Sequence, residues 1–346
     1  MAFQSARTGL AAAVAGLLLV GAAACNTDSK SADEDGAITL YSGREEALVQ
    51  PLIDQFTEDT GIEVEVHYGD TAEKATQLLE EGERTPADVF LAQDAGALGA
   101  LARAEMFAAL SHDVLDRVDA RYRAVDDTWV GLTGRSRVLV YNPDLVDAED
   151  LPESVLDLAE PAWAEKTAIA PLNGSFQAFV TALRVVEGDD AARDWLQALA
   201  DNDAPTREKN GPIVADVAAG ELEVGLVNHY YIYEKAAEDG VSVDELDAKL
   251  HYFTGGDAGA LVNVSGVGVL NHAEGDDDVA AFTSYLLETD AQEYFATETY
   301  EYPLVDGVEG PENQPALSEL DPPDINLNDL DDLETTVSMI QESGLA

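Results

Sequence analysis

From residue 37 onward, apolar positions alternate between short runs typical of strands and the spacing of a helix face. The run 37–41 predicts a strand, and 45–59 predicts a helix in which Pro51 marks a kink or a first-turn position. The same patterns predict strands over 62–68, 87–91, 129–133, 138–141, 167–170 and 224–227, and helices over 72–81, 95–104, 175–187, 190–200 and 213–219. This alternation predicts α/β units around a largely parallel sheet.

The last third of the chain changes order. Two β-rich segments, 251–253 and 260–270, precede helical patterns, which cover 277–288, 291–297 and 330–343. Polar stretches punctuated by glycine, near 133–137 and 255–260, are suited to crossovers between two lobes. We therefore expect two α/β lobes rather than one large sheet, with a ligand cleft between them.

The first 36 residues follow another pattern. Arg7 precedes an apolar run over 9–21 that is too short for a membrane span, and three alanines lead to Cys25. We expect a lipoprotein signal peptide over 1–24, a lipid-bearing Cys25 as the mature N-terminus, and a flexible tether over 25–36. The alternative is an ordinary signal peptide with an incidental cysteine. Either way the mature protein is expected to work outside the cytoplasm.

Charge excludes several partners. The 346 residues carry 18 Lys+Arg against 69 Asp+Glu, a net charge of −51, which opposes binding to nucleic acid or to an anionic membrane surface. Hydrophobic residues still make up 46% of the chain, enough for a core, so the acidity is not a sign of disorder. Because the acids are scattered along the whole chain, we expect a halophilic acidic surface rather than an acidic tail.

Two adjacent tyrosines are the most unusual local feature. Tyr230 and Tyr231 follow Asn228-His229, immediately after the expected buried strand 224–227. Residues just beyond the carboxyl end of such a strand face the ligand crevice of an open α/β sheet. A trivalent hard cation such as ferric iron prefers oxygen donors and displaces phenolic protons. The alternative is an aromatic pair that packs a helix start or stacks on a sugar.

A second candidate lies after the first strand. Gly43 permits a tight turn there, and a helix begins directly afterwards. Glu45 is either a carboxylate that the helix N-terminus stabilises or a ligand that points into the cleft.

An oxyanion also has candidate partners. Asn173-Gly174-Ser175 follows the strand 167–170 and opens a helix, so its backbone N–H groups suit an anion such as carbonate or phosphate. Arg135 and Arg137 are notable in a chain with few cations, and they either neutralise a bound anion or form ordinary salt bridges.

Enzyme signatures are missing from the sequence. The zincin, nucleophile-elbow, Walker and dinucleotide-binding motifs do not occur, and the five histidines lack metal-ligand spacing. The single cysteine excludes an intramolecular disulfide and a cysteine metal cluster. We therefore expect no enzyme, and a secreted hydrolase is the least favoured hypothesis.

Several ordered motifs resemble one family, the ferric-ion-binding proteins that serve ABC importers, within the type II periplasmic-binding-protein fold. The resemblance covers nearly all of the mature chain. The segments that carry it are 38–43, 86–90, 129–138, 228–231, 257–262 and 301–304. It implies a two-lobed α/β fold, with lobe 1 formed by 37–136 and 261–305 and lobe 2 by 137–260 and 306–346.

The resemblance also implies a set of metal ligands. In the family the adjacent tyrosines bind iron, so these roles pass to Tyr230 and Tyr231. Glu45 stands where a histidine ligand is common, and Gln93 stands where some members have a glutamate ligand. Fe(III), two phenolates and the Glu45 carboxylate are together neutral, so the altered set is electrostatically reasonable.

A bridging anion is bound in some members of the family. The matching residues are Asn173, Gly174 and Ser175, together with Asn210 and Asn228. Other members add a third tyrosine near this loop, where Phe176 stands here. Carbonate or phosphate would be offset by Arg135 or Arg137 and by the helix N-terminus at Asn173.

The expected function follows from the resemblance. We expect a monomeric lipoprotein that captures ferric iron in its cleft, closes by hinge motion and delivers the ion to an ABC permease in the cytoplasmic membrane. Membrane contact is expected only through the lipid on Cys25. The alternative is a receptor of the same fold for an organic solute or an oxyanion.

Overall fold

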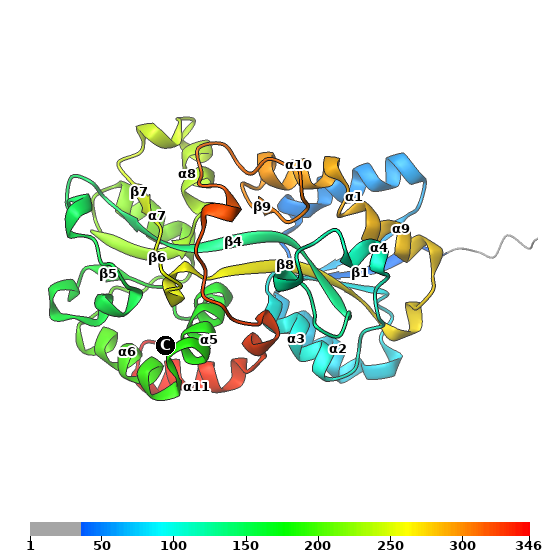
Figure 1. The fold of residues 1–346 in the computed structure, drawn as a ribbon, viewed down its shortest axis with the longest axis horizontal. Helices are drawn as coiled ribbons and strands as arrows, with labels where there is room; N and C mark the ends of the chain where they lie inside the picture. The colour runs from blue at the N-terminus through cyan, green and yellow to red at the C-terminus, as the bar shows by residue number, and fades with distance from the viewer. Residues whose placement is uncertain (1–35) are drawn as a thin grey trace, which may run out of the picture. The chain divides into compact units, whose positions relative to one another are not determined.

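The computed structural model describes residues 36–346, whose strands form one mixed sheet flanked by helices (Figure 1). Along the sheet the strand order is β2-β1-β3-β8-β4-β6-β5, and β7 and β9 also pair with β4. The strands are β1 (Ile38–Ser42), β2 (Val64–Tyr68), β3 (Val89–Ala92), β4 (Trp129–Tyr141), β5 (Thr167–Ala168), β6 (Val224–Asn228), β7 (Lys249–His251), β8 (Val262–Val269) and β9 (Tyr302–Pro303). The expected signal peptide, Cys25 and nearly all of the tether lie outside the described residues.

One long strand replaces two expected ones. β4 runs unbroken through 133–137, where the sequence predicted a crossover loop between two shorter strands. Its first part pairs with β8, and its second part pairs with β6 and β7. The crossover itself is therefore present, but as extended backbone, because residues 133–136 pair with β8 and residue 137 pairs with β6, which satisfies their buried N–H and C=O groups. In Figure 1, β4 and β8 run together across the molecule.

Parallel pairing is confined to the two ends of the sheet. β1 pairs in parallel with β2 and β3, and β5 with β6, as βαβ units require. The β3–β8, β4–β8, β4–β6, β4–β7 and β4–β9 pairings are antiparallel. The expectation of a largely parallel sheet is therefore wrong at its centre, because the strands that cross between the two halves run opposite to their neighbours.

The helices match the sequence pattern with shifted ends. They are α1 (Glu46–Thr60), α2 (Thr71–Glu81), α3 (Ala95–Arg103), α4 (His112–Leu115), α5 (Gly174–Glu187), α6 (Asp189–Asp201), α7 (Asn210–Ala218), α8 (Tyr231–Asp239), α9 (Asp277–Tyr285), α10 (Thr289–Glu298) and α11 (Leu333–Ser343). Pro51 lies on the exposed face of α1, beyond its first turn, so the first-turn alternative is wrong. The helix expected over 213–219 begins earlier, at Asn210, and the last helix begins later, at Leu333.

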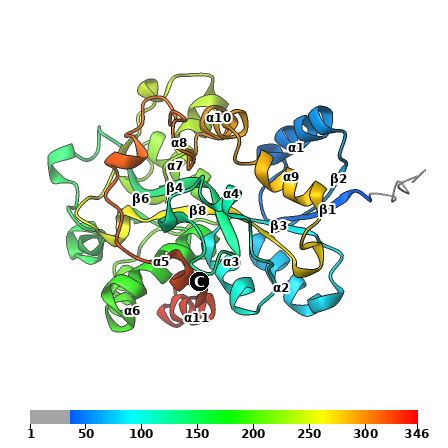
Figure 2. The same cartoon turned by 45° about the vertical axis from the view of Figure 1, so that its right-hand side comes forward.

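Helices cover both faces of each half of the sheet. Near β1 and β3, α1 and α9 lie on one face and α2 and α3 on the other (Figure 2). Near β6, α7 and α8 pack together on one face, while α5, α6 and α11 pack together on the other (Figure 1). This layering buries both faces of the parallel strands, as their nearly continuous apolar sequences require.

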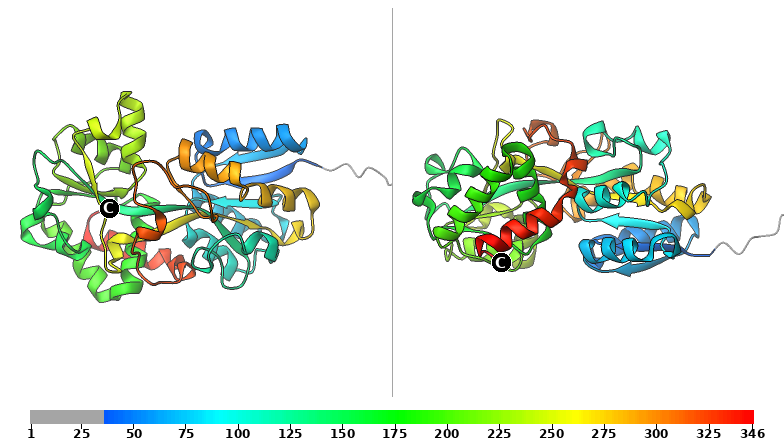
Figure 3. Two further views of the ribbon diagram at one scale, coloured as in Figure 1. Left: turned by 45° about the horizontal axis from the view of Figure 1, so that its top comes forward. Right: turned by 90° about the horizontal axis from the view of Figure 1, so that it is seen from below.

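The C-terminal segment connects the two halves. The 3₁₀ helix Leu327–Asp331 contacts both α3 and α5, and α11 then lies along α5 and α6 (Figure 3). Gly344 ends α11 in the left-handed conformation at φ 82°, which confirms the expected capped last helix.

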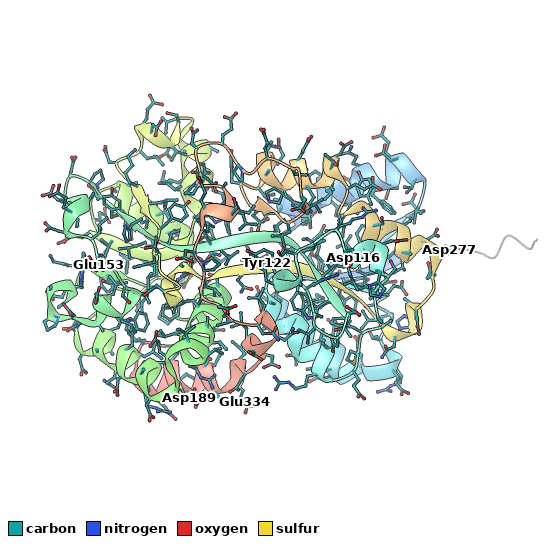
Figure 4. The ribbon with its side chains drawn as sticks, viewed as in Figure 1. Asp116, Tyr122, Glu153, Asp189, Asp277 and Glu334 are labelled. Carbon is teal, nitrogen blue, oxygen red and sulfur yellow. The ribbon has the colours of Figure 1, made fainter. Side chains whose placement is uncertain are left out.

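Acidic side chains are spread over the described surface. Figure 4 labels five exposed examples on well separated segments, namely Asp116, Glu153, Asp189, Asp277 and Glu334. This distribution agrees with the scatter of acids along the sequence. No helix among residues 36–346 is both long and apolar enough to cross a bilayer.

Candidate functional site

The tyrosine pair sits where β6 ends and α8 begins. Tyr230 is the N-cap residue of α8 and Tyr231 is the first residue of the helix. Their rings are stacked, with centroids 4.3 Å apart and planes inclined by 28°. Tyr230 is buried and Tyr231 half-buried, so the two phenols lie side by side at the carboxyl end of a buried strand. The sequence prediction of this placement is confirmed.

The Tyr230 hydroxyl is protonated at neutral pH. Burial and the neighbouring Tyr231 raise the pKa of the Tyr230 hydroxyl well above its usual value, and the nearby Arg135 guanidinium only partly opposes this rise. Such a phenol ionises at neutral pH only when a strongly charged cation takes the place of the proton. A cation that bound the Tyr230 oxygen would therefore have to displace this proton.

A buried ion cluster lies beside the pair. Arg44 donates two hydrogen bonds to Glu301, Nη1 to Oε1 at 2.7 Å and Nη2 to Oε2 at 2.6 Å. The Nε of Arg135 lies 3.6 Å from Glu301 Oε1, and Thr299 Oγ1 donates to Glu301 Oε2 at 3.0 Å. Burial alone would raise the pKa of the Glu301 carboxyl, but the Arg44 guanidinium outweighs it and holds the pKa below its usual range. Glu301 thus joins the β1–α1 loop to β4.

Arg137 is a buried cation without an acidic partner. It donates through Nη1 to Ser175 Oγ at 3.3 Å and to Asn228 Oδ1 at 3.4 Å, and through Nη2 to the Leu226 carbonyl at 2.9 Å. Its Nε has no hydrogen-bond partner among the described residues. Burial lowers the pKa of Arg137 to about 9, so the guanidinium remains charged at neutral pH. A buried charge of this kind favours an anionic ligand.

The predicted anion loop converges on Arg137. Asn173 Oδ1 accepts from the Ser175 backbone N–H at 3.0 Å, and Asn210 Nδ2 donates to Ser175 Oγ at 3.0 Å. Gly174 opens α5 directly after Asn173. The buried Asn210 Oδ1 has no hydrogen-bond partner in the described part of the chain. Six predicted anion residues therefore lie together, whereas Arg135 is held on the Glu301 side.

The other two predicted metal ligands, Glu45 and Gln93, lie at the start of α1 and directly after β3. Glu45 is the exposed N-cap residue of α1, and its side chain makes no capping hydrogen bond. Gln93 follows β3, and its buried Oε1 has no hydrogen-bond partner within 36–346. No hydrogen bond among these residues joins Gln93 to the tyrosine pair. The residue after it, Asp94, caps α3 by accepting from the Ala97 backbone N–H at 3.0 Å.

Carboxylates and imidazoles alone do not form a metal cage here. Among residues 36–346, no group of three or more His, Cys, Asp or Glu side chains is arranged to hold an ion. His229 is fully buried, with Nδ1 accepting from the Ser136 N–H at 3.2 Å and Nε2 donating to the Tyr300 carbonyl at 2.9 Å. Burial lowers the pKa of His229 to about 4, so the ring is neutral at pH 7, and both of its nitrogens are hydrogen-bonded to backbone groups.

The sequence analysis does not identify two charged residues of the buried ion cluster. Arg44 is a cation in a chain with few cations, the same signal that singles out Arg135. Glu301 lies 257 residues from Arg44, and no local sequence pattern predicts their pairing.

A separate cavity of about 810 Å³ lies between α8, α10 and the segment after β9. Tyr233, Tyr300 and several acidic side chains line it, but none of the predicted site residues does. Its position sets it apart from the tyrosine pair.

Known proteins resemble this chain over most of its length. A family model described as bacterial extracellular solute-binding protein matches residues 84–332. The Fe(3+)-binding periplasmic protein of Serratia marcescens is 34% identical over 318 residues, which cover 92% of this chain and 93% of that protein. The major ferric iron-binding protein of Neisseria meningitidis serogroup B is 31% identical over 310 residues, 89% of this chain and 93% of that protein.

Among solved structures, iron-bound HitA from Pseudomonas aeruginosa has a TM-score of 0.83 and 33% identity, and covers 89% of this chain and 99% of that chain. Apo ferric ion-binding protein A of Pasteurella haemolytica has a TM-score of 0.79 at 24% identity, over 89% of this chain and 98% of that chain. The expected two-lobed type II periplasmic-binding-protein fold is thereby confirmed.

Proposed function

Because this chain belongs to the bacterial extracellular solute-binding proteins, in the branch of ferric-iron-binding members, we propose that it captures ferric iron outside the cytoplasm and delivers it to an ABC permease. The observation that carries this proposal is the stacked pair Tyr230 and Tyr231, set beside buried arginines at the end of β6. Phenolate oxygens are donors that a trivalent hard cation prefers.

The metal set that we propose is Tyr230, Tyr231 and Glu45, with Gln93 as a neutral oxygen donor. Fe(III) displaces the two phenolic protons, and the resulting phenolates with the Glu45 carboxylate balance the charge of the ion. The unpartnered Oε1 of Gln93 supports its place in the set, since a buried amide oxygen without a hydrogen bond is costly unless a ligand satisfies it. Glu45 comes from the β1–α1 turn, on the other half of the sheet from the tyrosines.

A bound anion is the second part of the proposal. The seven residues that we assign to it are Asn173, Gly174, Ser175, Asn210, Asn228, Arg135 and Arg137. The unpaired charge of Arg137 and the open Oδ1 of Asn210 support an oxyanion such as carbonate or phosphate beside the metal.

Ferric titration in high salt tests the metal proposal. Wild-type protein is expected to develop a visible tyrosinate-to-iron absorption band, which Tyr230→Phe weakens because one phenolate donor is lost. Tyr233→Phe is the matched control, because the Tyr233 hydroxyl donates to the Asn313 carbonyl at 3.1 Å, away from the pair. A colourless wild-type protein, or equal bands in both variants, would refute the assignment.

One rival function remains worth testing. The buried Arg137 beside four polar side chains also suits an oxyanion or organic-anion receptor that needs no iron. Calorimetric titration with phosphate or carbonate in the presence of a ferric chelator separates the two. Binding without iron favours the rival, whereas anion binding only together with Fe(III) favours the iron site.

We propose closure about the strands that cross between the lobes. Lobe 1 would comprise 37–136 and 261–305, and lobe 2 would comprise 137–260 and 306–346. β4 passes from lobe 1 to lobe 2 at 136/137, and the chain returns to lobe 1 at 260/261, directly before β8, so small dihedral changes at these crossings would open and shut the cleft. Iron would drive closure because it binds donors on both sides only in the closed state.

The last part of the proposal concerns how the protein is anchored to the membrane. Residues 1–24 would be removed as a signal peptide, and a lipid on Cys25 would hold a monomer at the outer face of the cytoplasmic membrane. A Cys25→Ala variant should be released into the medium, and retention on the membrane would contradict the anchor. We assign no catalytic role to the protein, and we attribute its acidic surface to a saline environment.

A further inference from the structure

Glu234 lies on the helix that carries the tyrosine pair. It is four residues after Tyr230 and three after Tyr231, and its backbone N–H donates to the Tyr230 carbonyl at 3.1 Å. Residues at these spacings share one face of a helix. Glu234 therefore extends the face of α8 on which the phenols stand.

The side chain of Glu234 is half-buried and has no ion-pair or hydrogen-bond partner in the described chain. Arg44 interacts electrostatically with Glu234, but both of its terminal nitrogens already donate hydrogen bonds to Glu301. An ordinary salt bridge therefore does not explain why a carboxylate is kept in this partly desolvated position.

Other carboxylates surround it instead. Burial raises the pKa of Glu234 to about 7, and the negative charges of Glu45, Glu301 and Glu238 add to the rise. Glu45 belongs to the N-terminus of α1, Glu301 to the segment before β9, and Glu238 to α8 itself. Each of these carboxylates disfavours the charged form of Glu234, whereas a bound cation near Glu234 would favour it.

We propose that Glu234 is a further ligand-side carboxylate of the iron site, facing Glu45 from the opposite half of the sheet and supplying the negative charge that Gln93 does not. This inference rests on the proposed iron function. The stacked phenols, which precede Glu234 by four and three residues on the same helix, point independently to a ligand there.

Charge balance gives Glu234 a defined task. Arg44, Arg135 and Arg137 carry three positive charges, and Glu301 cancels one of them. Iron with two phenolates and Glu45 is neutral, so two buried positive charges still need compensation. Glu234 supplies one negative charge, and a singly charged form of the bound anion supplies the other.

Paired glutamine variants test the inference. Glu234→Gln keeps the shape of the side chain and removes its charge, and we expect the apparent Fe(III) affinity, measured by competition with citrate, to fall at least tenfold. Glu238→Gln, one turn further along α8 and exposed, is the matched control and should change affinity less than twofold. Glu234→Asp, which retains the charge, should recover part of the loss.

The outcomes separate this inference from the function on which it rests. A wild-type protein without a tyrosinate-to-iron band overturns the proposed function. A wild-type protein with the band, and a Glu234→Gln variant that binds iron as tightly as Glu238→Gln, overturns the role of Glu234 alone. In the unmodified protein, Ga(III) should shift the ¹³C carboxyl resonance of Glu234 and leave that of Glu238 in place; an unshifted Glu234 signal in Ga(III)-loaded protein also overturns it.

Discussion

Glu301→Gln should be among the most destabilising single changes at the site. The substitution removes the only carboxylate that contacts the guanidinium groups of Arg44 and Arg135 in the described chain, and all three side chains are about 2% exposed. Breaking a buried ion pair from one side costs about 3–5 kcal/mol, because the remaining charge stays buried without compensation. Here two guanidinium groups are left, and the glutamine amide accepts at most part of what two hydrogen bonds of 2.7 and 2.6 Å provide.

The assay is denaturant unfolding of iron-free protein at constant salt. Asp190→Asn is the control, since Asp190 pairs with Arg193 at 3.1 Å on the surface and is fully exposed. Exposed pairs contribute less than about 1 kcal/mol, so the control should remain near wild type. If Glu301→Gln unfolded with a free energy within about 1 kcal/mol of that control, the buried cluster would not have the energetic role assigned to it.

The effect should also depend on pH. The Glu301 pKa is held below its usual value of 4.5, so the unfolded chain binds more protons there than the folded chain does. The stabilisation by Glu301 is therefore complete above pH 4.5 and is lost as the pH falls through the lower folded-state value. The difference between wild type and Glu301→Gln should shrink in that acidic range, and a difference that grew instead would contradict the sign of the shift.

Two other predictions concern packing and charge. Gly225→Ala should lower the free energy of unfolding by about 1–3 kcal/mol, because the added methyl would overlap Ile213 Cγ2 beside a fully buried strand. The double variant with Ile213→Ala should lose less stability than the sum of the two single variants. Strict additivity of the two losses would contradict the overlap. Raising NaCl from 0.1 to 1 M shortens the screening length from about 10 to 3 Å, so a chain of net charge −51 should unfold at a higher temperature. Equal concentrations of a neutral sugar serve as the comparison, and an unchanged or lower midpoint in salt would argue against self-repulsion.

Local patterns predict the parts of the site that lie close together in sequence. Tyr230 and Tyr231 are adjacent and follow a strand whose apolar run is unambiguous, so their position at its carboxyl end follows directly. The turn at Asn173 is predictable for a similar reason, because a strand, a short loop that contains Pro171 and Asn173, and a helix come in immediate succession.

Local sequence patterns do not predict pairings between residues far apart in the chain. The bidentate bond between Arg44 and Glu301 depends on β9 returning to pair with β4, and β9 has only two residues, too few to show a period. The continuity of β4 is missed because Gly134 lowers the apparent strand propensity, although Leu304 and Tyr302 fill the space that its missing side chain leaves. Tertiary packing determines both the Arg44–Glu301 pairing and the continuity of β4.

The distribution of charge links the two ligands of the proposed function. Arg137 of β4, Asn210 at the start of α7 and Asn228 at the end of β6 are buried, while Glu45 is exposed at the start of α1. The phenols lie near buried cations, since Arg44 and Arg137 each interact electrostatically with Tyr230 and Tyr231. A cation would be drawn toward the carboxylates and the phenolic oxygens, and an anion toward the arginines. Neither ligand alone would neutralise the cleft, so metal and anion should bind more tightly together than apart.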